Sequence, residues 1–173
     1  MLRTPAPLIG ALGIKRNAVP APHQRDYFAE LYVAGLMGDS GWAIYFPKRD
    51  VGFDFIAVLT MNGTSLVRPV QVKGLYPTEE KRDKAYYGYI GKLTQLHDDM
   101  ILVLPYFSTN QAGPAPECIA FMPRVEIRPQ ASRGFKCTPA YFQGGRATPR
   151  KTFEKHFGLP GLALTAALDW GKT

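Results

Sequence analysis

Cysteine and histidine are scarce in this chain of 173 residues, and long apolar runs are missing. The two cysteines, Cys118 and Cys137, have no CxxC spacing, which argues against a disulfide framework and favours a reducing compartment. The three histidines are scattered, so a structural zinc site is not expected. Because no apolar run reaches the roughly 18 residues of a transmembrane helix, we expect a cytoplasmic protein with no membrane partner.

Acidic residues are also in the minority, with 14 Asp and Glu against 21 Lys and Arg and a formal net charge of +7. Most of this excess lies between Arg124 and Lys155, where eight basic residues face two acidic ones. A clustered basic surface attracts nucleic acids through phosphate contacts, whereas a solvated basic face without a partner is the plainer alternative. We expect nucleic-acid contacts from this segment and from an earlier charged loop, namely from Lys81, Arg82, Lys84, Arg146, Arg150 and Lys151.

The length of the chain suits one ordinary domain, and its 46% hydrophobic residues are close to the globular average. Residues 1–22 are rich in proline and alanine and predict a flexible arm. We expect a folded core over residues 23–125 and a basic C-terminal extension over residues 126–173 that packs on the same domain.

The first regular element is predicted as a helix over His23–Gly38, followed by a short strand over Trp42–Phe46. Residues at i, i+3 and i+4 spacing predict one apolar stripe on the helix, made by Tyr27, Phe28, Leu31, Tyr32, Gly35 and Leu36. Glu30 lies well off the centre of this stripe, so on periodicity alone it is expected to be exposed.

A β-hairpin is predicted next. Phe53–Thr60 and Leu66–Lys73 are strand-like runs, and Asn62-Gly63 lies between them. Asn-Gly is the strongest short-range hairpin signal, because both residues tolerate the positive φ angles of a type I′ turn.

The register of this hairpin follows from the two-residue turn. If Met61 pairs with Thr64, Asp54 lies directly opposite Gln71 in a non-hydrogen-bonded pair, and Lys73 projects from the same face. Pro69 then faces Ile56, also in a non-hydrogen-bonded pair, so that its missing N–H points away from the partner strand.

The rest of the chain is less regular. Met100–Phe107 is a nearly continuous apolar run, typical of a strand buried on both faces, and Cys118–Met122 predicts another short strand. Pro129–Pro149 is rich in turn residues, and Phe153–Leu168 predicts a terminal helix interrupted at Gly158–Gly161.

Three motifs occur in order along the first half of the chain: Glu30 within Phe28-Ala29-Glu30-Leu31-Tyr32, then Gly52-Phe53-Asp54, then Val70-Gln71-Val72-Lys73-Gly74. Over residues 25–107 this order resembles the PD-(D/E)XK nuclease superfamily, especially its bacterial branch with a QxK motif. The resemblance implies an α/β fold with αβββαβ order, in which a mixed central sheet is flanked by helices. The helix before the last strand would fall in Ala85–His97, which is ambiguous between helix and strand.

The same resemblance implies a metal site. Asp54, the amide oxygen of Gln71, the backbone carbonyl of Val72 and the carboxylate of Glu30 would hold Mg²⁺ or Mn²⁺, with Lys73 as the catalytic cation. These residue types suit the chemistry, because phosphodiester hydrolysis needs charge neutralisation at the phosphoryl oxygens and a nucleophile made from water. Taken singly, each residue has a plainer interpretation as a surface or strand-end side chain.

The expected activity is therefore that of a Mg²⁺-dependent DNA endonuclease of restriction, repair or junction type. Phe53 replaces the proline of the motif, and Gln71 replaces its second acid, which weakens the expected hold on a divalent ion. A catalytically silent nuclease fold that binds nucleic acid or protein, and a basic α/β RNA-binding module, are the alternatives. DNA is the expected partner, a homodimer is left open, and no small-molecule cofactor is expected.

Overall fold

The computed structural model describes residues 22–49, 51–77, 87–108, 115–131, 134–144 and 146–171. The predicted arm therefore lies outside the described residues, except for Pro22, where the first helix begins. Lys81, Arg82 and Lys84 of the charged loop also lie outside them. The two cysteines are free thiols.

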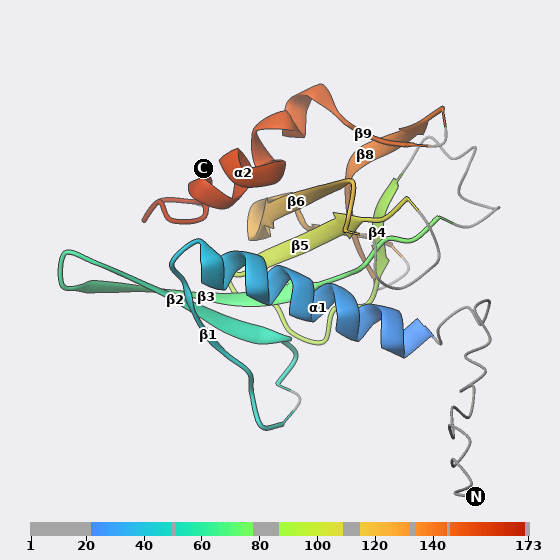
Figure 1. Cartoon of the computed structure of the whole chain (residues 1–173). Coiled ribbons are helices and arrows are strands. Elements are labelled where there is room, and N and C mark those ends of the chain that lie inside the picture. Colours follow the sequence, from blue (N-terminus) through green and yellow to red (C-terminus); the bar gives the residue numbers. More distant parts are fainter. Residues whose placement is uncertain are drawn as a thin grey trace, which may run out of the picture.

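The chain forms an α/β protein made mostly of strands, with a mixed five-stranded sheet at its centre (Figure 1). Its strand order is β1-β2-β3-β5-β6, and all neighbours are antiparallel except β3 and β5, which run parallel. The elements of this half are α1 (Pro22–Asp39), β1 (Ala43–Tyr45), β2 (Phe55–Met61), β3 (Thr64–Val72), β5 (Ile101–Tyr106) and β6 (Cys118–Pro123).

A second, four-stranded antiparallel sheet lies against one face of the first, where the resemblance had implied a helix. Its strands are β4 (Tyr87–Gly91), β7 (Arg128–Pro129), β8 (Phe135–Gln143) and β9 (Arg146–Pro149). Within the described part of the connection from β3 to β5, the ambiguous segment 85–97 contributes β4 and no helix. The described part of this segment therefore does not form the helix that the resemblance implies, because β4 pairs with β8 of the second sheet.

The C-terminal half also differs from expectation. The segment predicted as turn-rich, 129–149, forms the long strand β8 and its partner β9. The 3-10 helices η2 (Arg124–Glu126) and η3 (Lys151–His156) precede the helix α2 (Gly158–Leu164). Gly158–Gly161 was expected to interrupt the terminal helix, but it forms the beginning of α2. Gly161 is needed there because a Cβ at this position would come within 2.1 Å of the backbone oxygen of His156.

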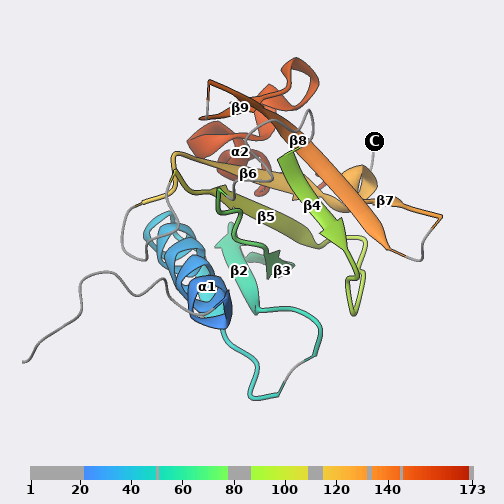
Figure 2. The same cartoon turned by 90° about the vertical axis from the view of Figure 1, so that its right-hand side faces the viewer.

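Two hydrophobic clusters cover the two faces of the central sheet. Figure 2 shows α1 on one side of this sheet and β4 and β8 on the other. One cluster joins the sheet to α1 and to the C-terminal residues Leu162 and Trp170. The other joins it to β4 and β8 through Tyr87, Cys137 and Ala140. All six residues of β5 are buried, as the apolar run 100–107 predicted for a strand covered on both faces.

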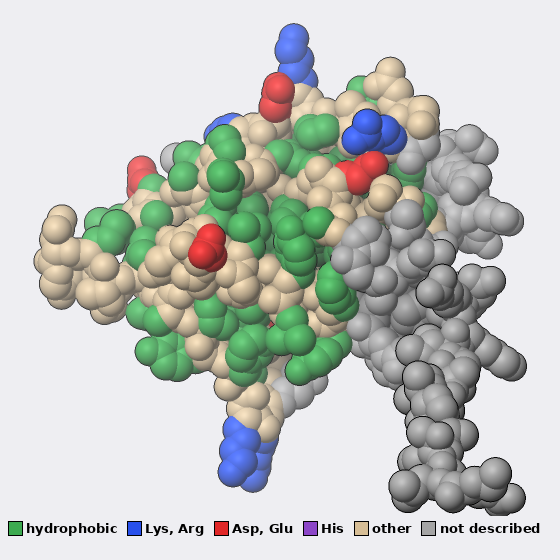
Figure 3. Space-filling view, viewed as in Figure 1, with side chains coloured by type: hydrophobic (Ala, Val, Ile, Leu, Met, Phe, Trp, Pro, Cys, Tyr) green, Lys and Arg blue, Asp and Glu red, His purple; other side chains and the backbone are tan. Residues whose placement is uncertain are grey.

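The face of α1 that packs on the sheet is only partly the predicted one, since Phe28, Tyr32 and Leu36 of the predicted stripe lie half-buried against the core. Ala29, Val33 and Met37, at i, i+4 and i+8, are fully buried. Tyr27 and Leu31, which the predicted stripe placed in the core, are 61% and 43% exposed, and the face of the molecule seen in Figure 3 carries many hydrophobic side chains. The small side chain of Ala29 lets this part of the helix lie close to the sheet.

The register predicted for the hairpin is confirmed along the whole β2–β3 ladder. Met61 pairs with Thr64, and the turn residues Asn62 and Gly63 have φ angles of 50° and 78°. Pro69 faces Ile56 as expected, and pairing of β3 with β5 begins only at the next residue. The proline therefore removes no ladder hydrogen bond on either side.

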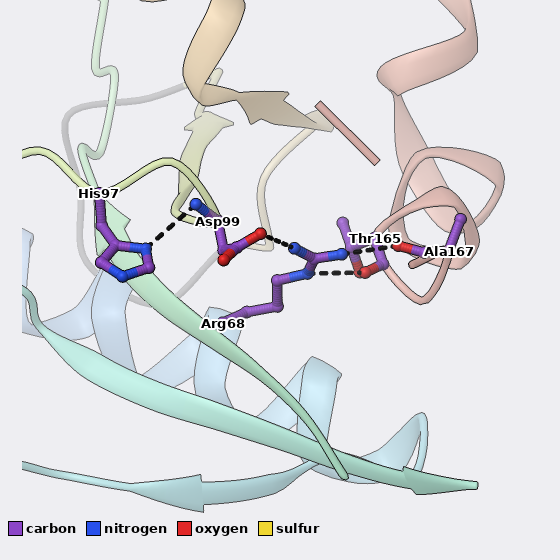
Figure 4. A network of polar contacts seen from close by, with 5 residues as sticks. All are labelled: Arg68, His97, Asp99, Thr165 and Ala167. Carbon is purple, nitrogen blue, oxygen red and sulfur yellow. Dashed lines mark hydrogen bonds and ion pairs between the residues drawn. The ribbon is translucent and has the colours of Figure 1, made fainter. Parts of the chain in front are cut away.

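A buried arginine ties this hairpin to the C-terminus (Figure 4). The side chain of Arg68, on β3, is fully buried. Its guanidinium donates to the backbone oxygens of Thr165 and Ala167 at 3.2 and 2.6 Å and pairs with Asp99 at 3.1 Å. It also lies over the ring of Trp170, 5.3 Å from the centroid. One side chain thus supplies partners for the carbonyls that follow α2.

We expect Arg68→Ala to destabilise the protein by about 3 kcal/mol, because it leaves buried carbonyl groups without donors and opens a cavity. Chemical denaturation followed by tryptophan fluorescence measures this loss. The matched control is Arg128→Ala, since this side chain is 76% exposed and its contact with Glu126 is 3.7 Å long; its effect should stay within about 0.5 kcal/mol. Equal losses for the two variants would contradict the anchoring role of Arg68.

Candidate active site

Asp54 lies at the point where the hairpin leaves the central sheet. The paired positions end at Phe55 and Val70, and the backbone N–H of Asp54 donates to the carbonyl of Val70 at 2.9 Å. Asp54 is therefore not a ladder partner of Gln71, in contrast to the predicted extension of the register. The two side chains still meet, because Gln71 Nε2 donates to Asp54 Oδ2 at 2.7 Å.

The backbone also fixes the Asp54 carboxylate. The N–H of Val72 donates to Oδ2 at 2.6 Å, so that this oxygen accepts two hydrogen bonds. No described residue donates a hydrogen bond to Oδ1. One oxygen of Asp54 is thus held by the protein and the other is available to a ligand.

Asp54, Gln71 and Lys73 line one hollow of about 170 Å³. Lys73 follows β3 directly, and its N–H donates to the carbonyl of Val103 at 2.9 Å, so its backbone remains held against β5. The prediction that Lys73 lies on the same side as Gln71 agrees with this shared lining.

The opposite wall of the hollow comes from the loop after β4 and was not predicted. Lys92, Leu93 and Thr94 line it together with Gly52. Gly52 has a φ of 82°, and a Cβ on it would lie 2.8 Å from that of Gln95. The glycine before the Phe53-Asp54 motif therefore allows this loop to close over the site. An isolated Gly in such a position was the only sequence signal for the close approach.

Glu30, on α1, does not line this hollow, but it lies close enough for the charges of Asp54 and Lys73 to act on it. The helix lies close to the chain after β3, since a Cβ on Gly74 would lie 3.0 Å from that of Ala29. Glu30 is half-buried, and the charges of Asp54 and Lys73 both shift its pKa. Its predicted exposure was wrong because the buried stripe of α1 runs through Ala29 and Val33, next to Glu30, and not through Tyr27 and Leu31.

Burial and, after it, the negative charge of Asp54 raise the pKa of Glu30 to about 7, against the opposing effect of the Lys73 charge. Burial also raises the pKa of Asp54, against the opposing effects of the Val72 hydrogen bond and the Lys73 charge. Two acids that share one partly buried place disfavour each other's ionisation. A cation between them would relieve this cost.

The donor atoms of the site fit a hard divalent cation. Two carboxylates, the amide oxygen of Gln71 and the carbonyl of Val72 are all oxygen ligands of the kind that Mg²⁺ and Mn²⁺ prefer. The unbonded Oδ1 of Asp54 and the raised pKa of Glu30 support this fit. In the described part of the chain, no group of three or more His, Cys, Asp or Glu side chains is placed to hold a metal, so amide and carbonyl oxygens would have to complete the ligand set.

The predicted nucleic-acid residues Arg146, Arg150 and Lys151 do not line this hollow. Arg146 pairs with Glu117 at 3.2 Å. Arg150 donates from Nε to the carbonyl of Thr138 and lies over the ring of Tyr141. Lys151 is exposed at the start of η3. Two of these three charges are thus already engaged within the protein.

Comparison of the sequence with protein-family models and with curated proteins finds no match. Among the described residues, no helix is long and apolar enough to cross a membrane.

The raised pKa of Glu30 predicts how stability changes with pH. The folded state binds more protons than the unfolded state between the ordinary pKa of 4.5 and about 7. Stability should therefore fall as the pH rises through this window. Glu30→Gln should reduce the fall and make the protein more stable than wild type at pH 8 without added metal. Urea denaturation from pH 4 to pH 8 measures this.

Asp39→Asn is the control for this series, because Asp39 is an exposed acid at the far end of the same helix. It should leave the pH dependence of wild type unchanged. A Glu30→Gln variant with the same pH dependence as wild type would show that Glu30 does not ionise in a shared site.

Proposed function

We propose that this protein is a divalent-metal-dependent DNA endonuclease with a PD-(D/E)XK type of site in a restriction-endonuclease-like core. The observation that carries the proposal is the convergence of Asp54, Gln71 and Lys73 on one hollow, with Glu30 approaching from α1. The order α1, hairpin and then a strand parallel to β3 also supports it.

Each side chain has a separate task in this proposal. Asp54 and Glu30 hold the cation, with the oxygens of Gln71 and Val72 completing its protein ligands. When bound, a divalent cation neutralises charge on the phosphoryl group and makes water more acidic. Lys73 places a positive charge where negative charge develops as the water oxygen bonds to phosphorus and the P–O bond of the leaving group breaks.

A silent nuclease fold that binds nucleic acid is the second candidate, and one observation favours it. The amide N–H of Gln71 donates a hydrogen bond to Asp54, and the side chain carries no negative charge. The site therefore has two carboxylates, where the motif usually supplies a further acid. Fewer charged ligands mean weaker binding of a divalent ion.

The direct test is cleavage of duplex, branched and single-stranded DNA in Mg²⁺, in Mn²⁺ and in EDTA. Asp54→Asn should abolish cleavage in every metal and keep DNA binding, because it removes the anchoring carboxylate and no basic residue. Lys73→Met should lower the rate by about 10²–10³-fold while leaving metal binding intact. Asp39→Asn should cut like wild type. Cleavage that survives Asp54→Asn would refute the assignment of the site.

Gln71→Glu tests whether the missing acid limits ion affinity. The change adds a carboxylate beside Asp54, so less Mg²⁺ should be needed for half-maximal cleavage. Without metal, the added repulsion should lower stability slightly at neutral pH, and Mg²⁺ should restore it. Titration of activity and of thermal stability with Mg²⁺ measures both effects. The silent-fold candidate is favoured if wild type cuts no substrate and Gln71→Glu neither cuts nor binds the ion more tightly.

A further inference from the structure

A second hollow, of about 410 Å³, lies beside the four-stranded sheet and carries mostly positive charge. Three basic residues and one acid line it together with Thr138 and Phe153, the charged ones being Arg128, Lys136, Arg150 and Glu126. Three positive charges and one negative charge leave a local excess of two positive charges. This site is separate from the Asp54 hollow, with which it shares no lining residue.

Strand register explains why these cations gather. Cys137 on β8 is buried in the second hydrophobic cluster, so Lys136 and Thr138 point to the outer face of the sheet. Arg128 on β7 pairs directly with Lys136, and the side chain of Arg128 is 76% exposed. Arg150 is held beside β8 by its hydrogen bond to the carbonyl of Thr138.

This arrangement favours an anionic ligand. The contact of Arg128 with Glu126 is 3.7 Å long, and the side chain of Arg128 is 76% exposed, so its guanidinium is accessible to a further partner. A phosphate group in the hollow would accept hydrogen bonds from lysine, arginine and threonine side chains alike.

The basic hollow and the candidate active site are connected through β4. Lys136 pairs on its other side with Ile90, whose side chain is 58% exposed. Lys92, two residues after Ile90, lines the Asp54 hollow. At a strand spacing of about 4.8 Å, the row from β4 through β8 to β7 spans about 10 Å. At about 3.4 Å per nucleotide of one strand, this is the length of about three nucleotides.

We infer that the outer row of the second sheet, Lys136 and Arg128 with Arg150, binds the phosphodiester backbone of the nucleic acid strand whose cleavage site lies at Asp54. This inference rests on the proposed nuclease function for the position of the cut. The inference assigns the principal phosphate contacts to the row next to β4, whereas the sequence had pointed to Arg146 and Lys151. The ligand is the sugar–phosphate backbone, so binding does not depend on base sequence.

The test compares two double variants that each remove two positive charges from the same part of the chain. Binding of a labelled DNA duplex, a DNA single strand and an RNA single strand is measured by fluorescence anisotropy in EDTA, over a range of salt concentrations. Arg128→Ala with Lys136→Ala should flatten the slope of log affinity against log salt by about two units and weaken binding roughly tenfold or more near 0.15 M salt. The matched control, Arg146→Ala with Lys151→Ala, should change the slope by much less.

Lys136→Gln alone keeps most of the side-chain stem and should flatten the slope by about one unit, which protects the test against a folding defect in the double variant. Equal flattening on DNA and RNA supports recognition of the backbone. Flattening that is as large or larger in the Arg146 and Lys151 pair overturns the inference. Since binding is measured without metal, a protein that cuts nothing can still satisfy this test, and a protein that cuts DNA can still fail it.

Discussion

The β2–β3 hairpin register is the constraint on which the candidate site depends. Side chains alternate between the two faces of a sheet, so a slip of one residue would move Gln71 to the α1 face and Arg68 to the opposite face. The turn at Asn62-Gly63 excludes this slip, because the pairing of Met61 with Thr64 determines every later pair up to Phe55 and Val70. One turn thereby places Arg68 against the C-terminus and Gln71 beside Asp54.

Close packing of α1 against the sheet is the second constraint on the site, because it determines where Glu30 lies. The helix approaches the sheet through alanine and valine, and Gly74 leaves room for Ala29. This brings the Glu30 carboxylate into the partly buried surroundings of Asp54 and raises its pKa to about 7. A helix packed through Tyr27 and Leu31 would stand farther from the sheet and leave Glu30 in solvent. The same packing that supports the fold therefore brings two acids close together, and the proposed cation would favour the ionised form of both.

Local patterns predicted the features that depend on neighbouring residues. The hairpin, its register, the position of Pro69 and the buried strand β5 all follow from turn chemistry and periodicity. The patterns failed where long-range packing decides. The centre of the buried stripe of α1 was misplaced because hydrophobicity ranked Tyr27 above Ala29, whereas the smaller side chain is the one that packs on the sheet. The loop at Lys92 was missed because nothing near it in sequence shows that Gly52 would meet Gln95. The second sheet was missed because the turn-rich composition of 129–149 hides the long strand β8.

The acidic and basic side chains of the two hollows lie in separate parts of the protein, and the two groups are best considered together. Asp54 lines one hollow, with Glu30 near enough for the two acids to repel each other, and the hollow beside β8 gathers three basic residues. A ligand of opposite charge would stabilise each group. In the proposed function both ligands belong to one assembly, since a phosphodiester brought to a divalent cation carries its own neighbouring phosphates. The basic row ends at β4, and Lys92, which follows β4, lines the Asp54 hollow. A strand bound along the basic row would therefore present one phosphate to the acid pair, and cation and nucleic acid would each favour binding of the other.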